Sequence, residues 1–97
     1  MPNLKRTYTV ILRSEPEGVF SVLVPALPGC FSMGDTIPEA LEMAEEAILC
    51  HIEMLHKLGK PIPREGTHVR LDPEDLTGTL FPYKVSVTLE AEVAKVA

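Results

Sequence analysis

The side chains that could bind or react with a ligand gather in one stretch, between residues 35 and 59. Glu39, Glu42 and Glu46 stand three and four residues apart, so on a helix they would lie near one another. Carboxylate oxygens are ligands for divalent cations, but such a row needs further ligands from a second segment. The sequence offers no clear second segment. We therefore predict a solvated acidic face, with no metal site and no cofactor.

The nucleophile and base candidates in the same stretch are Cys50, His51 and His56. Adjacent helical residues point about 100° apart, so Cys50 and His51 do not make a Cys–His pair by themselves. The two histidines are five residues apart, whereas helical metal ligands are typically four apart. A Cys–His pair assembled from distant segments stays open. At such a position Cys50 is expected to be a small buried residue, and we predict no enzyme.

This stretch is predicted to form one amphipathic helix of about six turns. Thr36 is a good N-cap, Glu39 completes a capping box, and Pro38 is tolerated in the first turn. Gly59 suits the left-handed residue that ends a helix. The apolar residues recur every three to four positions and share a face that a sheet must cover: Ile37, Leu41, Ala44, Ile48, Ile52 and Leu55.

The remaining segments with strand character predict that sheet. Residues 8–13 and 19–24 form a hairpin, and residues 30–33 form a short third strand before the helix. Residues 83–89 alternate between apolar and polar side chains, which is typical of a half-buried strand. A further brief strand is expected at residues 68–71. The predicted fold class is α+β, in the order β-β-β-α-β, with a three-stranded antiparallel sheet plus a C-terminal strand packed on one long helix.

Composition limits the classes of partner. The chain has 97 residues, the usual size of one domain, and 45% hydrophobic residues. Its net charge of -5 disfavours non-specific contact with nucleic acid, because phosphates demand a cationic face. Cys30 and Cys50 form no disulfide framework. No segment has the length of a signal peptide or a membrane span, so we expect a cytoplasmic protein with no membrane contact.

An apolar cluster, Leu80 to Tyr83, adjoins the C-terminal strand. A partner chain could cover this cluster, since exposed apolar patches mark interaction sites. Phe31, by contrast, is expected to pack in the core. The strand either completes the chain's own sheet or pairs with its copy in another subunit. For a homo-oligomer, we predict an interface formed by Phe81, Tyr83, Val85, Val87 and Leu89.

The spacing of three short motifs resembles the N-terminal domain of HicB-type antitoxins. These are Val-Pro-Ala-Leu-Pro-Gly-Cys at 24–30, Gly-Asp-Thr at 34–36 and Glu-Ala-Leu at 39–41. The resemblance runs from about Tyr8 to Pro63. It implies a β-β-β-α-β fold like a truncated ribonuclease-H fold, without the catalytic carboxylates of that fold.

Members of this family typically neutralise a small basic toxin, a HicA-like ribonuclease that cleaves mRNA. The resemblance implies that this domain masks the active and RNA-binding surface of such a toxin. An acidic antitoxin facing a cationic surface is electrostatically sensible, since complementary charge speeds encounter. We expect the toxin to contact the early helix and the loop before it, through Asp35, Glu39, Glu42, Glu46, Leu27 and Met33.

The chain departs from the family after the helix. Family members often carry a C-terminal helix-turn-helix or ribbon-helix-helix module, and residues 84–89 look like the opening strand of the latter. Residues 84–97 are too few for the helices that should follow. We therefore interpret 1–97 as a single HicB-like domain, with 84–97 as a possible truncated remnant, and expect no DNA binding.

Other readings of the function stay open. The main alternative to an antitoxin is an orphan homo-oligomeric scaffold or binding module of the same fold without a toxin partner. A neighbouring gene for a small basic protein would favour the antitoxin. A hydrolase would need carboxylates or a Cys–His pair gathered in a cleft, and a DNA-binding autorepressor would need a longer chain.

Overall fold

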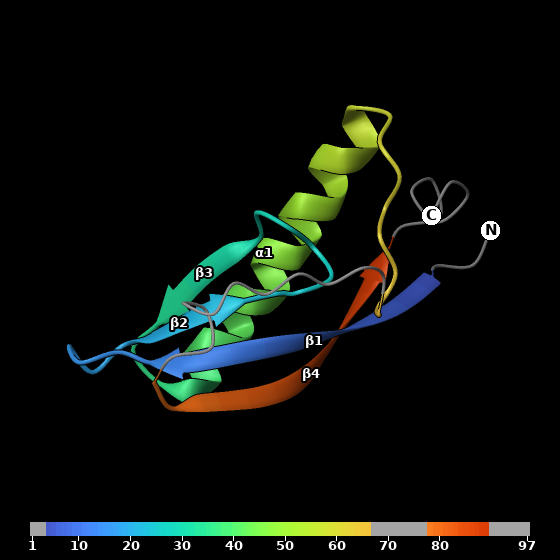
Figure 1. The fold of residues 1–97 in the computed structure, drawn as a ribbon. Coiled ribbons are helices and arrows are strands. Elements are labelled where there is room, and N and C mark those ends of the chain that lie inside the picture. Colours follow the sequence, from blue (N-terminus) through green and yellow to red (C-terminus); the bar gives the residue numbers. More distant parts are fainter. Residues whose placement is uncertain (1–3, 67–77, 90–97) are drawn as a thin grey trace.

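The computed structural model describes residues 4–66 and 78–89, and it confirms the α+β fold and the predicted order of elements (Figure 1). The three strands before the helix and the one after it form a single four-stranded antiparallel sheet. The helix lies along one face of that sheet. The elements are β1 (Leu4–Ser14), β2 (Phe20–Leu23), β3 (Phe31–Gly34), α1 (Ile37–Lys57) and β4 (Leu80–Leu89).

The strands lie in the order β3-β2-β1-β4, so the first strand of the chain is central and the last one is an edge. β4 pairs with β1 along its whole length, from Leu4 opposite Leu89 to Arg13 opposite Leu80. The C-terminal strand therefore completes the chain's own sheet. This pairing also explains why β1 begins at residue 4 and not at the predicted residue 8, since its N-terminal half is extended by its contact with β4.

Local signals set both ends of α1 as predicted. The Thr36 side chain accepts a hydrogen bond from the Glu39 backbone N–H at 3.2 Å. At the other end Gly59 has φ of +68°, and its N–H donates to the His56 carbonyl while that of Lys60 donates to the Leu55 carbonyl. This pair of hydrogen bonds is the Schellman arrangement, which satisfies two carbonyls of the last turn.

The core lies between α1 and the sheet. The helix contributes Ala40, Ala44, Ile48 and Ile52, all fully buried. Three residues of the predicted apolar face, Ile37, Leu41 and Leu55, are only half-buried at its margins. The sheet side of the core comes from alternate residues of the strands and from the segment after β2: Tyr8, Val10, Leu12, Val22, Val24, Ala26, Leu27, Cys30, Val85, Val87 and Leu89.

A buried hydroxyl helps to hold the connector after α1, residues 58–66, to the sheet. Tyr8 is 0% exposed, and its hydroxyl donates to the Pro63 carbonyl at 2.6 Å. Ile62, next to it, joins the core. Burial raises the pKa of Tyr8, and the neighbouring Arg6 partly offsets this rise. The hydrogen bond therefore anchors residue 63, in the segment after α1, to β1.

Two expectations about the burial of single residues are wrong, and one expected strand cannot be compared with the structure. Phe31 is 63% exposed and not in the core, because β3 is an edge strand and its alternate residues point away from the helix. Cys50 is exposed and not buried, because it lies on the flank of α1. The strand expected at residues 68–71 lies outside the described residues.

Candidate partner-binding surface

The first half of α1 carries an exposed acidic face. Asp35, Glu39, Glu42 and Glu46 are all exposed, as the sequence predicts for a solvated helix surface. Glu39 also lies in the first turn, where the positive end of the helix dipole stabilises a carboxylate. Among the described residues no group of three or more His, Cys, Asp or Glu side chains is placed to hold a metal ion. The face is suited to contact with a cationic surface.

Exposed apolar side chains lie on edge strand β3. Phe31 is 63% exposed and Met33 is 59% exposed. Phe31 lies opposite Leu23, and Leu23 lies opposite Ile11, so an apolar row continues across the outer face of the sheet. A depression of about 250 Å³ follows this row, lined by Ile11, Arg13, Ser21, Val22, Leu23, Phe31, Ser32 and Met33. An exposed Phe and Met on one edge are typical of a surface that binds a partner.

A second, shallower groove runs between β3 and α1 and adjoins the acidic face. Its volume is about 270 Å³, and Phe31 belongs to both grooves. Glu46 precedes Cys50 by one helical turn, so Glu46 borders the groove. The groove is lined by Gly29, Cys30, Phe31, Ala47, Cys50, His51 and Met54. Apolar surface and negative charge therefore meet around β3.

Gly29 and His51 lie next to each other in the lining of this groove. Gly29 has φ of +87°, a backbone conformation that L side chains rarely adopt, and a Cβ there would lie 3.8 Å from His51 Cε1. Partial burial of the imidazole lowers the pKa of His51. Burial therefore disfavours a positive charge on His51 at the acidic side of the molecule.

Leu27 is not part of this surface. The sequence suggested it as a contact residue, but it is 0% exposed and packs in the core. The chain turns at this point, where Leu27 N–H donates to the Val24 carbonyl and Cys30 N–H donates to the Leu27 carbonyl. These turns direct the leucine inward and leave Met33, on β3, as the exposed residue of the pair that the sequence proposed.

The two cysteines differ in chemistry. Cys30 is buried, and burial together with the nearby Cys50 raises the pKa of its thiol to about 11. A thiol with so high a pKa is a poor nucleophile at neutral pH. Cys50 is exposed in the groove beside His51. The structure brings the two cysteines and His51 near one another, a proximity that helical spacing alone did not reveal.

The predicted oligomer residues of β4 face the helix. Val85, Val87 and Leu89 are 9%, 2% and 3% exposed and belong to the core of the single chain. Their side chains are therefore not free on the surface, because the alternation of β4 points them at α1. Phe81 and Tyr83 are half-buried, and the Phe81 ring meets Phe20 edge to face at 6.2 Å.

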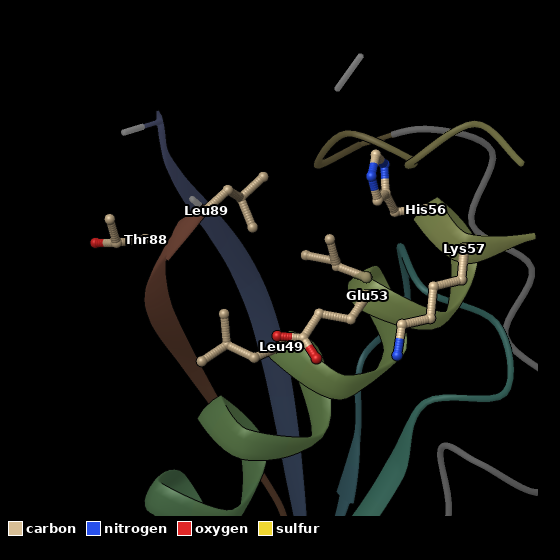
Figure 2. Close-up of a pocket in the computed structure, with 7 residues that line it drawn as sticks. Leu49, Glu53, His56, Lys57, Thr88 and Leu89 are labelled. Atoms are coloured by element: carbon tan, nitrogen blue, oxygen red, sulfur yellow. The ribbon is translucent and has the colours of Figure 1, made fainter. Parts of the chain in front are cut away.

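An apolar pocket opens where the end of β4 meets the second half of α1 (Figure 2). Its volume is about 250 Å³. Figure 2 shows Leu49, Glu53, His56 and Lys57 along the helix and Leu89 on the strand across from them, while Thr88 points away from the helix. Ile52 also lines the pocket. Sequence periodicity placed Ile52 in the core but could not show this opening.

The polar face of β4 carries a small cluster on the outside of the sheet. Lys84 Nζ lies 2.9 Å from Glu65 Oε2 and 2.7 Å from Thr9 Oγ1, and Thr9 also donates to Glu65. Burial alone would raise the pKa of Glu65, but the hydrogen bonds from Thr9 and Lys84 outweigh it and lower the pKa. This cluster joins the connector to both central strand β1 and edge strand β4.

In the described part of the chain, no helix has the length and apolar character needed to cross a membrane.

The chain is similar to known proteins in sequence and in structure. A UPF0150 protein of Thermoplasma acidophilum is 50% identical over 59 residues, which are 61% of this chain and 86% of that protein. Antitoxin HicB 1 of Photorhabdus laumondii is 37% identical over 59 residues, 61% of this chain and 38% of that protein. A solved HicA3 and HicB3 toxin-antitoxin complex contains a similar chain, with 28% identity and a TM-score of 0.64, covering 84% of this chain and 96% of that one.

The family model described as the HicB_like antitoxin of bacterial toxin-antitoxin systems matches residues 8–94. This range includes the whole of α1, strands β2 and β3 with the acidic and apolar surface around them, and β4. The chain therefore belongs to the HicB-like antitoxin family.

Proposed function

We propose that this protein is a non-catalytic antitoxin that binds a small basic, mRNA-cleaving toxin of the HicA type and masks its RNA-binding and active surface. The similarity to a chain of a HicA3–HicB3 complex supports the class of partner. We place this binding in the cytoplasm, where an mRNA-cleaving toxin would act.

The observation that carries the proposal is the meeting of acidic and apolar surface around β3. A toxin that binds RNA needs a cationic surface for the phosphates. Here Glu39, Glu42 and Glu46 present exposed carboxylates on α1, and Phe31 and Met33 are exposed on β3, the neighbouring edge strand. The carboxylates would mimic the charge of RNA, and the apolar side chains would supply buried contact area at the centre of the interface.

The first test is co-purification with the product of an adjacent reading frame that encodes a small basic protein, followed by an RNA-cleavage assay. We expect a stoichiometric complex that no longer cleaves RNA. Cleavage that continues with the antitoxin in excess would contradict masking. Absence of any complex would favour the alternative of an orphan binding module of the same fold.

The second test locates the binding face with two neighbouring glutamates. Glu46 borders the groove beside β3, whereas Glu45 is exposed about 100° around the helix from it. Glu46→Lys and Glu45→Lys change the net charge equally. We expect Glu46→Lys to slow toxin association at low salt by about fivefold, corresponding to about 1 kcal/mol for one close charge pair in water. Glu45→Lys should have a smaller effect, and equal effects would mean that only the overall charge matters.

A further inference from the structure

The groove between β3 and α1 brings the two cysteines of the chain together. Cys30 lies just before β3, and Cys50 lies in the second half of α1, twenty positions later in the sequence. Both line the same groove, whose volume of about 270 Å³ is below the usual size of a ligand pocket. Side chains around so small a groove are near neighbours. The proposed function gives neither thiol a role.

The residues next to the cysteines show that the two segments touch. A Cβ built on Gly29 would lie 3.8 Å from His51 Cε1, and the cysteines are the immediate chain neighbours of these two residues. Burial is the main cause of the raised pKa of Cys30, and the nearby Cys50 adds to it. This second effect requires the two sulfur atoms to be close, because the interaction between charges weakens with distance.

The groove exposes one thiol and buries the other. Cys50 is exposed to solvent, whereas Cys30 is 3% exposed and its backbone N–H donates to the Leu27 carbonyl. An oxidant that enters the groove from solvent therefore meets Cys50 first. Cys30 then lies behind Cys50, on the protein side. An exposed thiol backed by a second thiol is the arrangement of an attacking and a resolving cysteine.

We propose that Cys50 and Cys30 form a reversible redox site that reacts with low-molecular-weight disulfides and closes to a disulfide within one chain. First, the Cys50 thiolate attacks one sulfur of the reagent, whose own S–S bond breaks and releases one thiolate. Next, the Cys30 thiolate attacks Cys50 Sγ, and the other half of the reagent leaves as a second thiolate. Both thiol protons pass to solvent, and the two electrons that the cysteines lose reduce the reagent to two thiols.

The first step is fast and the second is slow. Because the pKa of Cys30 is about 11, only a small fraction of this residue is thiolate at neutral pH. Two effects compensate for that small fraction. A thiolate of high pKa is intrinsically the stronger nucleophile. Cys50 is also already beside Cys30, so the second step is intramolecular and avoids the entropy cost of an encounter.

The disulfide would fasten the start of β3 to α1. The loop that it closes runs from residue 30 to residue 50 and contains Phe31, Met33 and the acidic residues of the proposed toxin surface. A disulfide stabilises a fold mainly by restricting the unfolded chain, so the oxidised protein should be the more stable form. A transient bond of this kind is the usual form of a cytosolic disulfide, and it differs from the structural framework that the sequence excludes.

This redox site does not rest on the proposed antitoxin function, because every step uses the single chain alone. A chain that closes the disulfide but binds no toxin would contradict only the proposed function. A chain that binds and silences a toxin but does not close the disulfide would contradict only the redox site.

The number of thiolates released per chain tests the proposal. The reduced full chain is mixed with an excess of dithiobis-nitrobenzoate, an aromatic disulfide that releases a coloured thiolate. We expect two thiolates per folded chain, one fast and one slow, and a final mass two hydrogens below that of the reduced chain. Cys30→Ala should release one thiolate and keep the aromatic adduct on Cys50. Cys50→Ser should release none while it is folded, as circular dichroism checks.

A displaced thiol is the matched control. In the Cys50→Ser background, Glu45→Cys places an exposed thiol on the same helix, about 140° around the axis from residue 50 and away from the groove. It should release one thiolate quickly and then keep its adduct, because no second thiol lies beside it. A second thiolate from this variant would mean that Cys30 reacts through opening of the fold, and would overturn the site in the groove.

Peptide mapping locates the bond and does not depend on any variant folding. A protease that cleaves after glutamate separates the two cysteines, because four glutamates lie between them: Glu39, Glu42, Glu45 and Glu46. The peptides that contain Cys30 and Cys50 should stay joined until a reductant is added. The oxidised chain should also unfold at a temperature at least about 5 °C higher than the reduced chain.

Three results would overturn the proposal. One is a wild-type chain that stops at one thiolate and keeps a stable adduct, because the two sulfur atoms then do not meet. Another is a disulfide that joins two chains. The third is an oxidised chain that is no more stable than the reduced one, because such a bond forms only by distorting the fold.

Discussion

At the scale of single residues, exposure decides what each side chain can do. Cys30 and Cys50 are the same residue type twenty positions apart, yet one is buried with a pKa of about 11 and the other is exposed on a helix flank. Tyr8 is a polar residue that the fold buries completely, and it keeps its hydroxyl hydrogen-bonded to the Pro63 carbonyl. Each of these environments gives a measurable chemical difference.

The cysteines should react with a thiol reagent at very different rates. In the folded protein we expect one fast thiol per chain, Cys50, whereas the reagent attacks Cys30 directly only after unfolding. Absorbance after addition of a disulfide reagent measures both. The Cys50→Ser variant should show no fast phase, and a fast reaction in that variant would contradict the burial of Cys30.

Tyr8 should make stability fall at high pH. Burial raises the pKa of Tyr8 in the folded chain above its ordinary value of 10.0, so above that pH the unfolded chain releases a proton that the folded chain keeps. The contribution of Tyr8 to stability is therefore constant below about pH 10 and decreases as the pH rises beyond it.

The Tyr8→Phe variant isolates this contribution. It should lose about 1 kcal/mol of unfolding free energy at neutral pH, since the hydrogen bond to Pro63 is gone. Denaturant unfolding at pH 8 and above pH 10 should show the gap between the two proteins narrowing. A gap that does not change with pH would contradict the assigned environment of Tyr8.

At the scale of elements, the backbones of β3 and α1 approach so closely at Gly34 that no side chain fits between them. A Cβ built on Gly34 would lie 2.5 Å from the Ala40 backbone nitrogen and 2.7 Å from its Cα. These atoms are backbone in the first turn of the helix, and they cannot rotate away. Gly34 therefore sets the approach of the helix to the edge strand that carries Phe31 and Met33.

Gly34→Ala should lower the unfolding free energy by about 3 kcal/mol, because the added methyl forces the helix away from β3. Thermal or urea unfolding measures this loss. Ser32→Ala, on the same strand, is the control and should change stability far less. A mild effect of Gly34→Ala would mean that the helix start can shift without loss of packing.

At the scale of the whole molecule, one helix supplies an entire side of the core. Ile48 is 0% exposed at the centre of α1, and its neighbour Leu49 is half-buried at the margin. Ile48→Ala should lower the unfolding free energy by about 3 kcal/mol, since it leaves a cavity between helix and sheet. Leu49→Ala removes a side chain of the same size and should cost less. Equal losses in denaturant unfolding would contradict the observed orientation of the helix.

The arrangement also separates the two edges of the sheet. β3 carries exposed apolar side chains and packs beside the acidic helix, and β4 forms the other edge of the described sheet. We propose that the toxin binds at the β3 edge. This separation follows from the strand order, because β2 and β1 lie between the two edges.

The sequence by itself determined the elements and their order. Thr36, Pro38 and Gly59 act on backbone groups within a few residues of themselves, so they fix the ends of α1 wherever the helix packs. The alternation in residues 83–89 correctly predicted a strand for the same local reason. The exposure of the acidic helix face was also predictable from the sequence, since charged side chains stay solvated whatever element packs on the other face of the helix.

Only the tertiary structure decided which faces are covered. A period of two tells which residues of a strand share a face, but not whether another element covers that face. Phe31 is therefore exposed, contrary to its expected place in the core, whereas Val85, Val87 and Leu89 are buried within the single chain. The neighbour of β4 was equally undetermined, because its pairing with β1 joins residues far apart in the chain. Burial depends on such distant neighbours, and the chain gains them only when it folds.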